Sequence, residues 1–243
     1  MSWGKFFAIA WKVIKEVIQH GPDLWVLICK LAQPVIDWWN GKKIAVIGPT
    51  AVGKNCLYHR LKDEPIPDQH EQTKGPEKIR KFVYRRTLPN EKRFEVMFKK
   101  CINIGGEMEQ RTRYWLDACK DADVIFYMIT LDDLKNHRFR KRSRIYSDLK
   151  WLATHMQKMK SGVLVHLLVN KIDKELEDGE GYREFIAKLK PHIDELEATA
   201  KAIFGDYQAK LTGISPTSMK DDHIFAVSFP MALQAVYKAV HRQ

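Results

Sequence analysis

A short apolar segment, residues 43–47, leads directly into Gly48-Pro-Thr-Ala-Val-Gly53-Lys54. The apolar run predicts a buried strand, and a loop bounded by two glycines predicts a sharp connection into a following helix. A strand–loop–helix unit of this kind is typical of a parallel sheet covered by helices on both faces. We therefore expect an α/β fold.

Strand and helix patterns alternate along the rest of the chain. We expect strands at residues 43–47, 78–86, 94–104, 123–130, 163–169 and 210–214. We expect helices at residues 54–61, 108–120, 139–160, 182–204 and 229–242, with Pro230 in the first turn of the last helix. The turn-rich stretch 88–91 predicts a hairpin within the otherwise parallel order.

The glycine loop matches GxxxxGK, a pattern whose backbone amides surround phosphate oxygens while Lys54 reaches the terminal phosphates. The alternative is a glycine-rich turn beside an ordinary lysine. The residues expected to bind a phosphorylated ligand are Gly48, Thr50, Ala51, Val52, Gly53, Lys54, Asn55 and Cys56.

A second motif, Asn170-Lys171-Ile172-Asp173, follows the apolar run 163–169. It therefore lies at the carboxyl end of the sheet, where α/β folds of this kind bind ligands. The Asp173 carboxylate can accept both donor hydrogens on the pyrimidine edge of guanine, an arrangement that adenine cannot satisfy. We expect Asn170 to brace the neighbouring loops and Lys171 to lie along the base.

From Lys42 to the C-terminus, the order of motifs resembles the Ras-like small GTPases. Residues 72–75 resemble the switch threonine region with Thr73, residues 103–107 resemble DxxGQ with Gly106, and residues 217–220 resemble the base-backing loop with Ser218 and Met219. The alternative for residues 217–220 is a plain surface turn. The doubled glycine and the apolar N-terminal segment look most like the ADP-ribosylation factor branch. The resemblance implies a three-layer P-loop GTPase fold with a mostly parallel six-stranded sheet, GDP or GTP as ligand, and Mg²⁺.

Three positions depart from that family pattern and affect the same chemistry. The family uses a Ser or Thr hydroxyl, an Asp and a Gln to hold Mg²⁺ and orient water, whereas this chain has Asn55, Asn103 and Glu107. We expect a weakened Mg²⁺ site formed by Asn55, Thr73 and Asn103, because a neutral amide is a poor substitute for a compact hydroxyl. Glu107 and Thr73 are the candidate catalytic residues. The alternative is that Glu107 faces solvent and Gln110 lies nearer the phosphate.

These departures predict a guanine-nucleotide switch that favours GDP and hydrolyses GTP slowly without a partner. An exchange or activating protein is a further expected partner. Two alternatives stay open for Asn55, a degenerate site that does not hydrolyse GTP and an engineered substitution. The rival function is a pseudo-GTPase that serves as a nucleotide-independent interaction or scaffold subunit.

Residues 1–39 differ in composition from residues 40–243, which we expect to form the GTPase domain. Five of the seven tryptophans lie in this first segment, and its apolar residues recur at helical spacing with lysines between them. Such a segment predicts an amphipathic anchor, through residues 3–39, to a membrane surface or a protein partner. The alternative is packing on its own domain, for which Trp38 and Trp39 are candidates. Ser2 replaces the glycine that N-myristoylation requires.

The net charge of +11 favours an anionic partner. The run 135–144 is strongly basic, but Phe139 is its sole aromatic residue, so no stacking platform for bases is present. We interpret this run as a solvated turn and do not expect a nucleic-acid partner. The four cysteines are scattered without metal-ligand spacing. We expect a cytoplasmic protein, peripheral on the cytosolic face of a membrane if the N-terminal segment binds lipid.

Overall fold

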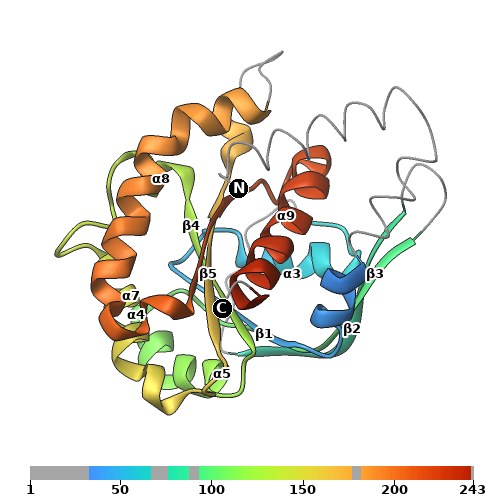
Figure 1. The fold of residues 1–243 in the computed structure, drawn as a ribbon, viewed down its shortest axis with the longest axis horizontal. Coiled ribbons are helices and arrows are strands. Elements are labelled where there is room, and N and C mark those ends of the chain that lie inside the picture. Colours follow the sequence, from blue (N-terminus) through green and yellow to red (C-terminus); the bar gives the residue numbers. More distant parts are fainter. Residues whose placement is uncertain (1–32, 67–75, 88–92, 177–181, 242–243) are drawn as a thin grey trace.

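A computed structural model describes residues 33–66, 76–87, 93–176 and 182–241. Its centre is a six-stranded sheet with the strand order β2-β3-β1-β4-β5-β6 (Figure 1). The strands are β1 (Lys43–Ile47), β2 (Glu77–Thr87), β3 (Arg93–Asn103), β4 (Val124–Thr130), β5 (Leu164–Asn170) and β6 (Leu211–Pro216). Only β2 runs antiparallel to its neighbour, and the other pairs are parallel. The predicted α/β class and the mostly parallel sheet are confirmed.

Helices cover both faces of this sheet (Figure 1). They are α3 (Lys54–Lys62), α4 (Met108–Gln110), α5 (Leu116–Cys119), α6 (Leu131–Lys135), α7 (Arg144–His155), α8 (Tyr182–Phe204) and α9 (Asp222–His241). A π-helical segment, Arg111–Trp115, joins α4 to α5, and short 3₁₀ segments occupy Met156–Lys158, Ile172–Lys174 and Gly205–Lys210. No helix within the described ranges is long and apolar enough to cross a bilayer.

The alternation of side chains along β4 shows why the fold has three layers. Phe126 and Met128 belong to the core shared with α3 and α9, whereas Tyr127 and Ile129 belong to the core shared with α7 and α8. A strand buried on both faces needs an almost continuous apolar sequence, which is what 124–129 provides. The pleat of the strand then sends successive residues to opposite layers.

The helical residues 33–39 pack on the face that carries α9. The indole of Trp39 is fully buried, stacks on the ring of Phe126 at 6.1 Å between centroids, and donates its N–H to the Leu233 carbonyl at 2.9 Å. Val35 is also buried in this cluster. The rest of the predicted N-terminal anchor, residues 1–32, lies outside the described part of the chain.

The prediction of one helix over residues 139–160 is wrong at its start. Helix α7 begins at Arg144, because the Ser143 hydroxyl caps it by accepting a hydrogen bond from the Tyr146 amide at 3.0 Å. The separate helix α6, which the sequence reading missed, is capped in the same way by Thr130 and Asp133. Short polar residues at these two positions stop a helix from running through.

The last helix also begins earlier than predicted. Helix α9 starts at Asp222, so Pro230 lies inside it and not in its first turn. The Asp221 carboxylate accepts a hydrogen bond from the Ile224 amide at 2.7 Å and caps the helix start. Phe225 lies within the added residues 222–228 and Phe229 directly follows them, and both rings are buried in the core on this face of the sheet. This packing favours the longer helix although Pro230 lacks a backbone donor.

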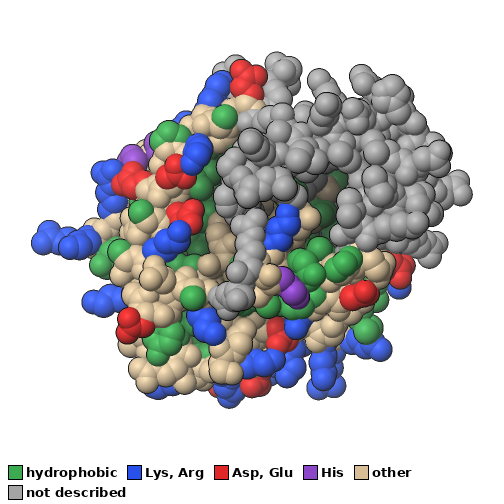
Figure 2. Space-filling model, in the orientation of Figure 1, with side chains coloured by type: hydrophobic (Ala, Val, Ile, Leu, Met, Phe, Trp, Pro, Cys, Tyr) green, Lys and Arg blue, Asp and Glu red, His purple; other side chains and the backbone are tan. Residues whose placement is uncertain are grey.

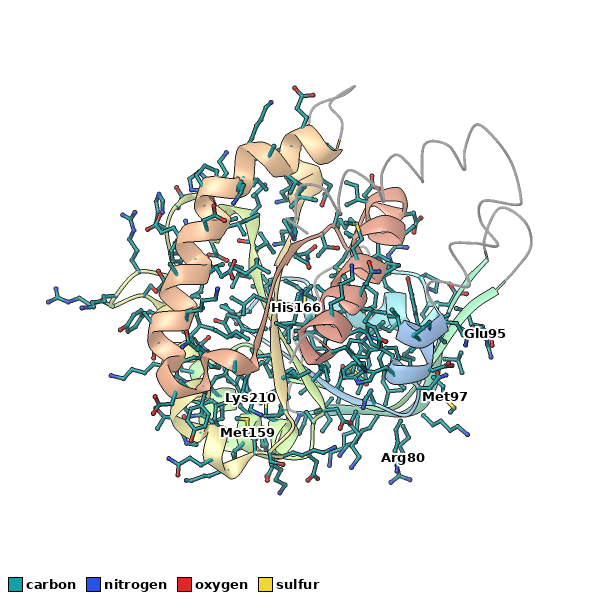
Figure 3. The ribbon with its side chains drawn as sticks, viewed as in Figure 1. Arg80, Glu95, Met97, Met159, His166 and Lys210 are labelled. Atoms are coloured by element: carbon teal, nitrogen blue, oxygen red, sulfur yellow. The ribbon has the colours of Figure 1, made fainter. Side chains whose placement is uncertain are left out.

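His166 lies on β5, between β4 and the edge strand β6 (Figure 3). Its ring is fully buried between the hydroxyls of Thr212 and Ser215, with N···O distances of 2.8 and 2.9 Å. Burial lowers the His166 pKa to about 3, so the ring is neutral at physiological pH. His166 is thus a core residue whose two ring nitrogens both have hydrogen-bond partners.

Candidate functional site

Four loops lie at the carboxyl ends of strands and form the candidate site. Residues 48–53 follow β1, residues 104–107 follow β3, residues 171–174 follow β5 and residues 217–220 follow β6. Because these strands are parallel, their carboxyl ends share one edge of the sheet, where α/β folds bind ligands. The sheet topology therefore brings the separate sequence motifs to the same edge.

The loop 48–53, the phosphate loop, has an anion-binding backbone shape. Ala51 and Gly53 have positive φ angles of 61° and 96°, and alternating backbone handedness of this kind turns successive N–H groups towards one point. Helix α3 begins at the next residue, which adds the positive end of its dipole. Thr50 and Ala51 are exposed at the loop tip, whereas Gly48 and Val52 are buried.

The Lys54 ammonium folds back over this loop. Its Nζ donates to the carbonyl oxygens of Gly48 at 3.0 Å and Pro49 at 2.6 Å. Burial, with a smaller contribution from the positive charge of Arg144, lowers the Lys54 pKa from 10.5 to about 7. A neutral amine still has two N–H groups, one for the Gly48 carbonyl and one for the Pro49 carbonyl. The side chain is thus held beside the loop without a negative partner strong enough to keep it fully protonated.

Asn170 ties the phosphate loop to the loop after β6. Its Nδ2 donates to the Val52 carbonyl at 2.8 Å, and its Oδ1 accepts from the Met219 amide at 2.9 Å. Gly53 allows this contact, because a Cβ at position 53 would lie 2.2 Å from Asn170 Nδ2. The bracing expected of Asn170 is present, and one amide fixes the distance between these two loops.

Asp173 lies half-buried beside Ser218. The Ser218 hydroxyl donates to Asp173 Oδ1 and accepts from the Asp221 amide at 3.0 Å. This chain of hydrogen bonds holds the carboxylate in a fixed orientation. Lys171 precedes it with a left-handed φ of 69°, and burial lowers its pKa.

Arg60 on α3 supports the 217–220 loop and was missed in the sequence reading. Its Nε donates to the Met219 carbonyl at 2.8 Å, its Nη2 donates to the Lys220 carbonyl at 2.8 Å, and Nη1 pairs with Asp222. No motif distinguishes Arg60 from other surface arginines. The residues 217–220 therefore form a supported loop, not the plain surface turn of the alternative.

The predicted metal residues Asn55 and Asn103 are in direct contact. Asn103 Nδ2 donates to Asn55 Oδ1 at 2.7 Å and to Glu77 Oε2 at 3.1 Å. Glu77 was missed because it lies 26 residues before Asn103, outside any motif. Thr73, the third predicted metal residue, lies outside the described residues. Cys56, next to Asn55, has a thiol pKa raised by burial.

The segment after β3 packs tightly against the phosphate loop. A Cβ added to Gly106 would lie 2.2 Å from Pro49 C and Thr50 N, so only glycine fits this approach. The predicted ligand residue Gly106 therefore contacts the loop backbone. Arg144 Nη2 donates to the Gly106 carbonyl at 3.0 Å and holds the segment in place.

The two candidate water-positioning residues follow this segment. Glu107 is exposed immediately before α4, as the alternative for that residue expected. Gln110 is half-buried, and its Oε1 is buried without a hydrogen-bond partner among the described residues. An unsatisfied acceptor at this place is available to a bound water or ligand donor.

A buried ion cluster lies behind the phosphate loop and was not predicted. The fully buried Asp148 accepts hydrogen bonds from Arg111 Nη1 at 2.8 Å, Arg144 Nε at 2.7 Å and the Tyr127 hydroxyl at 3.1 Å. Arg111 begins the π-helical segment, a distortion that often accompanies functional positions. The cluster joins the segment after β3 to α7. Arg144 and Asp148 are four residues apart on α7, whereas Arg111 and Tyr127 reach Asp148 only through tertiary packing.

The basic residues of the run 135–144 mostly have acidic partners. Ion pairs join Lys135 to Glu175, Arg138 to Asp132, Arg140 to Glu195 and Arg144 to Asp148. On the face in Figure 2, Lys and Arg side chains are spread over the left and lower parts with Asp and Glu between them. Lys135, Arg138, Arg140, Lys141 and Arg142 are exposed, which agrees with a solvated basic turn.

Comparison with known proteins gives one informative similarity. The chain is 30% identical over 142 residues to GTPase Der from a Nitratiruptor species, a stretch that covers 56% of this chain and 27% of that protein. No family model matches the chain. The chain thus spans about a quarter of the relative's length. This weak similarity and the mostly parallel six-stranded sheet fit a P-loop GTPase.

Proposed function

We propose that this protein binds guanine nucleotide as a P-loop GTPase. The observation that supports this most is the Asn170 amide, which hydrogen-bonds the phosphate loop through Val52 and the base-side loop through Met219. A nucleotide needs its phosphate site and its base site at a fixed separation, and this amide sets that separation. An ordinary glycine-rich turn has no need of such a link.

The phosphates lie on the amides of residues 52–55 and the Lys54 ammonium, at the start of α3. Guanine donates two hydrogens to Asp173, whose orientation the Ser218 hydroxyl already holds. Adenine has no matching pair of donors on that edge. The site therefore selects guanine over adenine through one carboxylate.

The site favours GDP over GTP for two reasons. First, Gly106 is packed so closely on Pro49 and Thr50 that a terminal phosphate entering between them has to displace the segment held by Arg144. Second, Asn55 and Asn103 offer neutral amides to Mg²⁺, which a triphosphate needs more than a diphosphate does. Hydrolysis without a partner is slow, because the exposed Glu107 replaces the neutral water-positioning glutamine. An exchange or activating protein then controls the switch.

The first test identifies the nucleotide released when the purified protein is denatured, and then titrates labelled GDP and GTP with and without Mg²⁺. We expect bound GDP and a lower affinity for GTP. Finding no nucleotide and no binding in either titration would refute the proposal and leave the rival function, a scaffold subunit whose fold no longer binds nucleotide.

The second test changes the base-reading carboxylate. Asp173→Asn removes the double acceptor, so GDP affinity falls at least about 100-fold, while xanthosine diphosphate, which has an acceptor in place of one donor, binds better than GDP. Asp206→Asn, an exposed aspartate away from the site, is the matched control and leaves both affinities unchanged. Equal GDP affinity in Asp173→Asn and wild type would refute the assignment.

Residues 33–39 of the predicted anchor pack on the domain, and we also propose that residues 3–32 attach the protein to a membrane surface on its cytosolic side. Support comes from the lysine-interspersed aromatic pattern of this segment, which residues 33–39 join to the domain through Trp39. Sedimentation of the full chain with vesicles containing phosphatidylserine tests it, with Trp3→Ser and Trp11→Ser as variants. Equal sedimentation of wild type and variants would favour a protein partner or packing on the domain instead.

A further inference from the structure

We propose that Glu77 supplies the carboxylate of the Mg²⁺ site, replacing the charge that position 103 lacks. This inference rests on the proposed nucleotide function. The cation would be held by Glu77 and the amide oxygens of Asn55 and Asn103, together with phosphate and water oxygens. All of these are hard oxygen ligands of the kind that Mg²⁺ binds.

The first step is convergence. The Asn103 amide nitrogen touches both Asn55 Oδ1, at 2.7 Å, and Glu77 Oε2, at 3.1 Å. Two oxygens from two different elements therefore point at one atom. Mg²⁺–oxygen distances are about 2.1 Å, so neighbouring oxygen ligands of an octahedral ion lie about 3 Å apart, close to the separations between the Asn103 side-chain position and the two oxygens.

The second step is the reason that Glu77 is held there. Glu77 lies directly opposite Asn103 in the antiparallel pair of β2 and β3, and side chains at directly opposite positions are close neighbours on the same face. The sheet register thus fixes the carboxylate beside position 103. Glu77 is exposed, which leaves the carboxylate accessible to a cation from solvent.

The third step is the state of the Asn103 side chain. It is fully buried, and its Oδ1 has no hydrogen-bond partner among the described residues. A buried acceptor without a hydrogen bond is unfavourable, so the Asn103 amide is not fully hydrogen-bonded in this orientation. Rotating the amide by half a turn would point Oδ1 at the oxygens of Asn55 and Glu77. Three oxygens facing one another repel unless a cation lies between them.

Charge is the final step. Asn55 and Asn103 contribute no net charge, so a site made of these two amides has little attraction for a divalent cation. Among the described residues no group of three or more His, Cys, Asp and Glu side chains could hold a metal ion. The Glu77 carboxylate, which accepts a hydrogen bond from Asn103, would supply the negative charge beside the two amides. The GTPase pattern has its carboxylate at position 103 on β3, whereas this chain has one at position 77 on β2, directly opposite.

The test uses the full chain and measures labelled GDP binding in EDTA and at increasing Mg²⁺, with Mn²⁺ binding to the GDP complex followed by electron paramagnetic resonance. We expect Glu77→Gln to bind GDP in EDTA as the wild type does, but to lose about 10- to 100-fold in Mg²⁺ and Mn²⁺ affinity. The matched control is Glu95→Gln on the same hairpin (Figure 3), which pairs with Arg85. It changes metal affinity by less than about twofold.

The double variant Glu77→Gln/Asn103→Asp returns the carboxylate to the facing strand, and we expect it to regain metal affinity. Urea unfolding of each variant shows that the fold is kept. Equal metal affinity in Glu77→Gln and wild type would overturn the inference while leaving nucleotide binding intact. No GDP binding by the wild type in any condition would instead refute the proposed function, and the metal site with it.

Discussion

Under the proposed function, the protonation of Lys54 makes nucleotide binding depend on pH in a way that can be calculated. Burial lowers its pKa to about 7 in the nucleotide-free protein. Bound phosphates add negative charge beside the ammonium and raise the pKa again, above about 10. Binding above neutral pH therefore takes up a proton. With these values, about 0.9 proton enters per nucleotide at pH 8 and about 0.1 at pH 6.

The same values set the change in affinity. The apparent Kd for GDP changes less than about twofold between pH 6 and 7, and rises about 16-fold between pH 7 and 8.5. The folded pKa lies below that of the unfolded chain, so the unfolded chain binds more protons between pH 7 and 10.5. The low pKa of Lys54 therefore destabilises the ligand-free fold at and below pH 7. This cost decreases as pH rises from 7 to 10.5, so the free energy of unfolding increases over the same range.

Calorimetric titration of GDP at pH 8, in buffers with different ionisation enthalpies, measures the proton uptake directly. Carbon-13 NMR of the lysine side chains gives the Lys54 pKa without ligand and serves as an independent check. Lys54→Met is the control variant, and its weaker binding proceeds without the uptake. A proton uptake near zero at pH 8 in the wild type would refute the reasoning, because it would show that Lys54 is already protonated.

Three further outcomes follow from the packing and charge of the fold. Asp148→Asn leaves Arg111 and Arg144 without their buried partner, so the free energy of unfolding in urea falls by about 3–5 kcal/mol; a loss below about 1 kcal/mol would mean that the cluster is solvated. Trp39→Ala lowers the free energy of unfolding by about 3–5 kcal/mol, whereas the half-buried Trp38→Ala costs less, and equal losses in the two variants would contradict the packing described. Asn55→Ser supplies a compact hydroxyl, so Mg²⁺-dependent GTP affinity rises at least about tenfold in titrations; an unchanged affinity would show that this position does not limit GTP binding.

The site could be predicted only in part from the sequence. The phosphate loop and residues 170–173 were found because each is a contiguous motif whose chemistry depends on residues within one turn of chain. Asn103 and residues 217–220 were found through the family resemblance. Glu77 and Arg144 carry no such signal, because each acts on a segment that is distant in sequence and reaches it only through the packing of the sheet.

Helix boundaries show the same division. Helix α3 was predicted to within a residue, since a glycine turn precedes it and a polar stretch follows it. The start of α9 was not, because Pro230 looked like a first-turn residue. The buried contacts of Phe225 and Phe229 with the sheet favour a longer helix, and tertiary packing of this kind overrides a local signal.

By itself, the sequence determined the class of fold, the order of the six strands along the chain and the loops that bear the motifs, because apolar periodicity and glycine position act locally. Only the tertiary structure decided which strands lie side by side, and with them the facing pair of Glu77 and Asn103 and the contact of Asn170 with two loops. Such contacts depend on strand register and on parallel crossovers, which bring together residues that no local interaction relates.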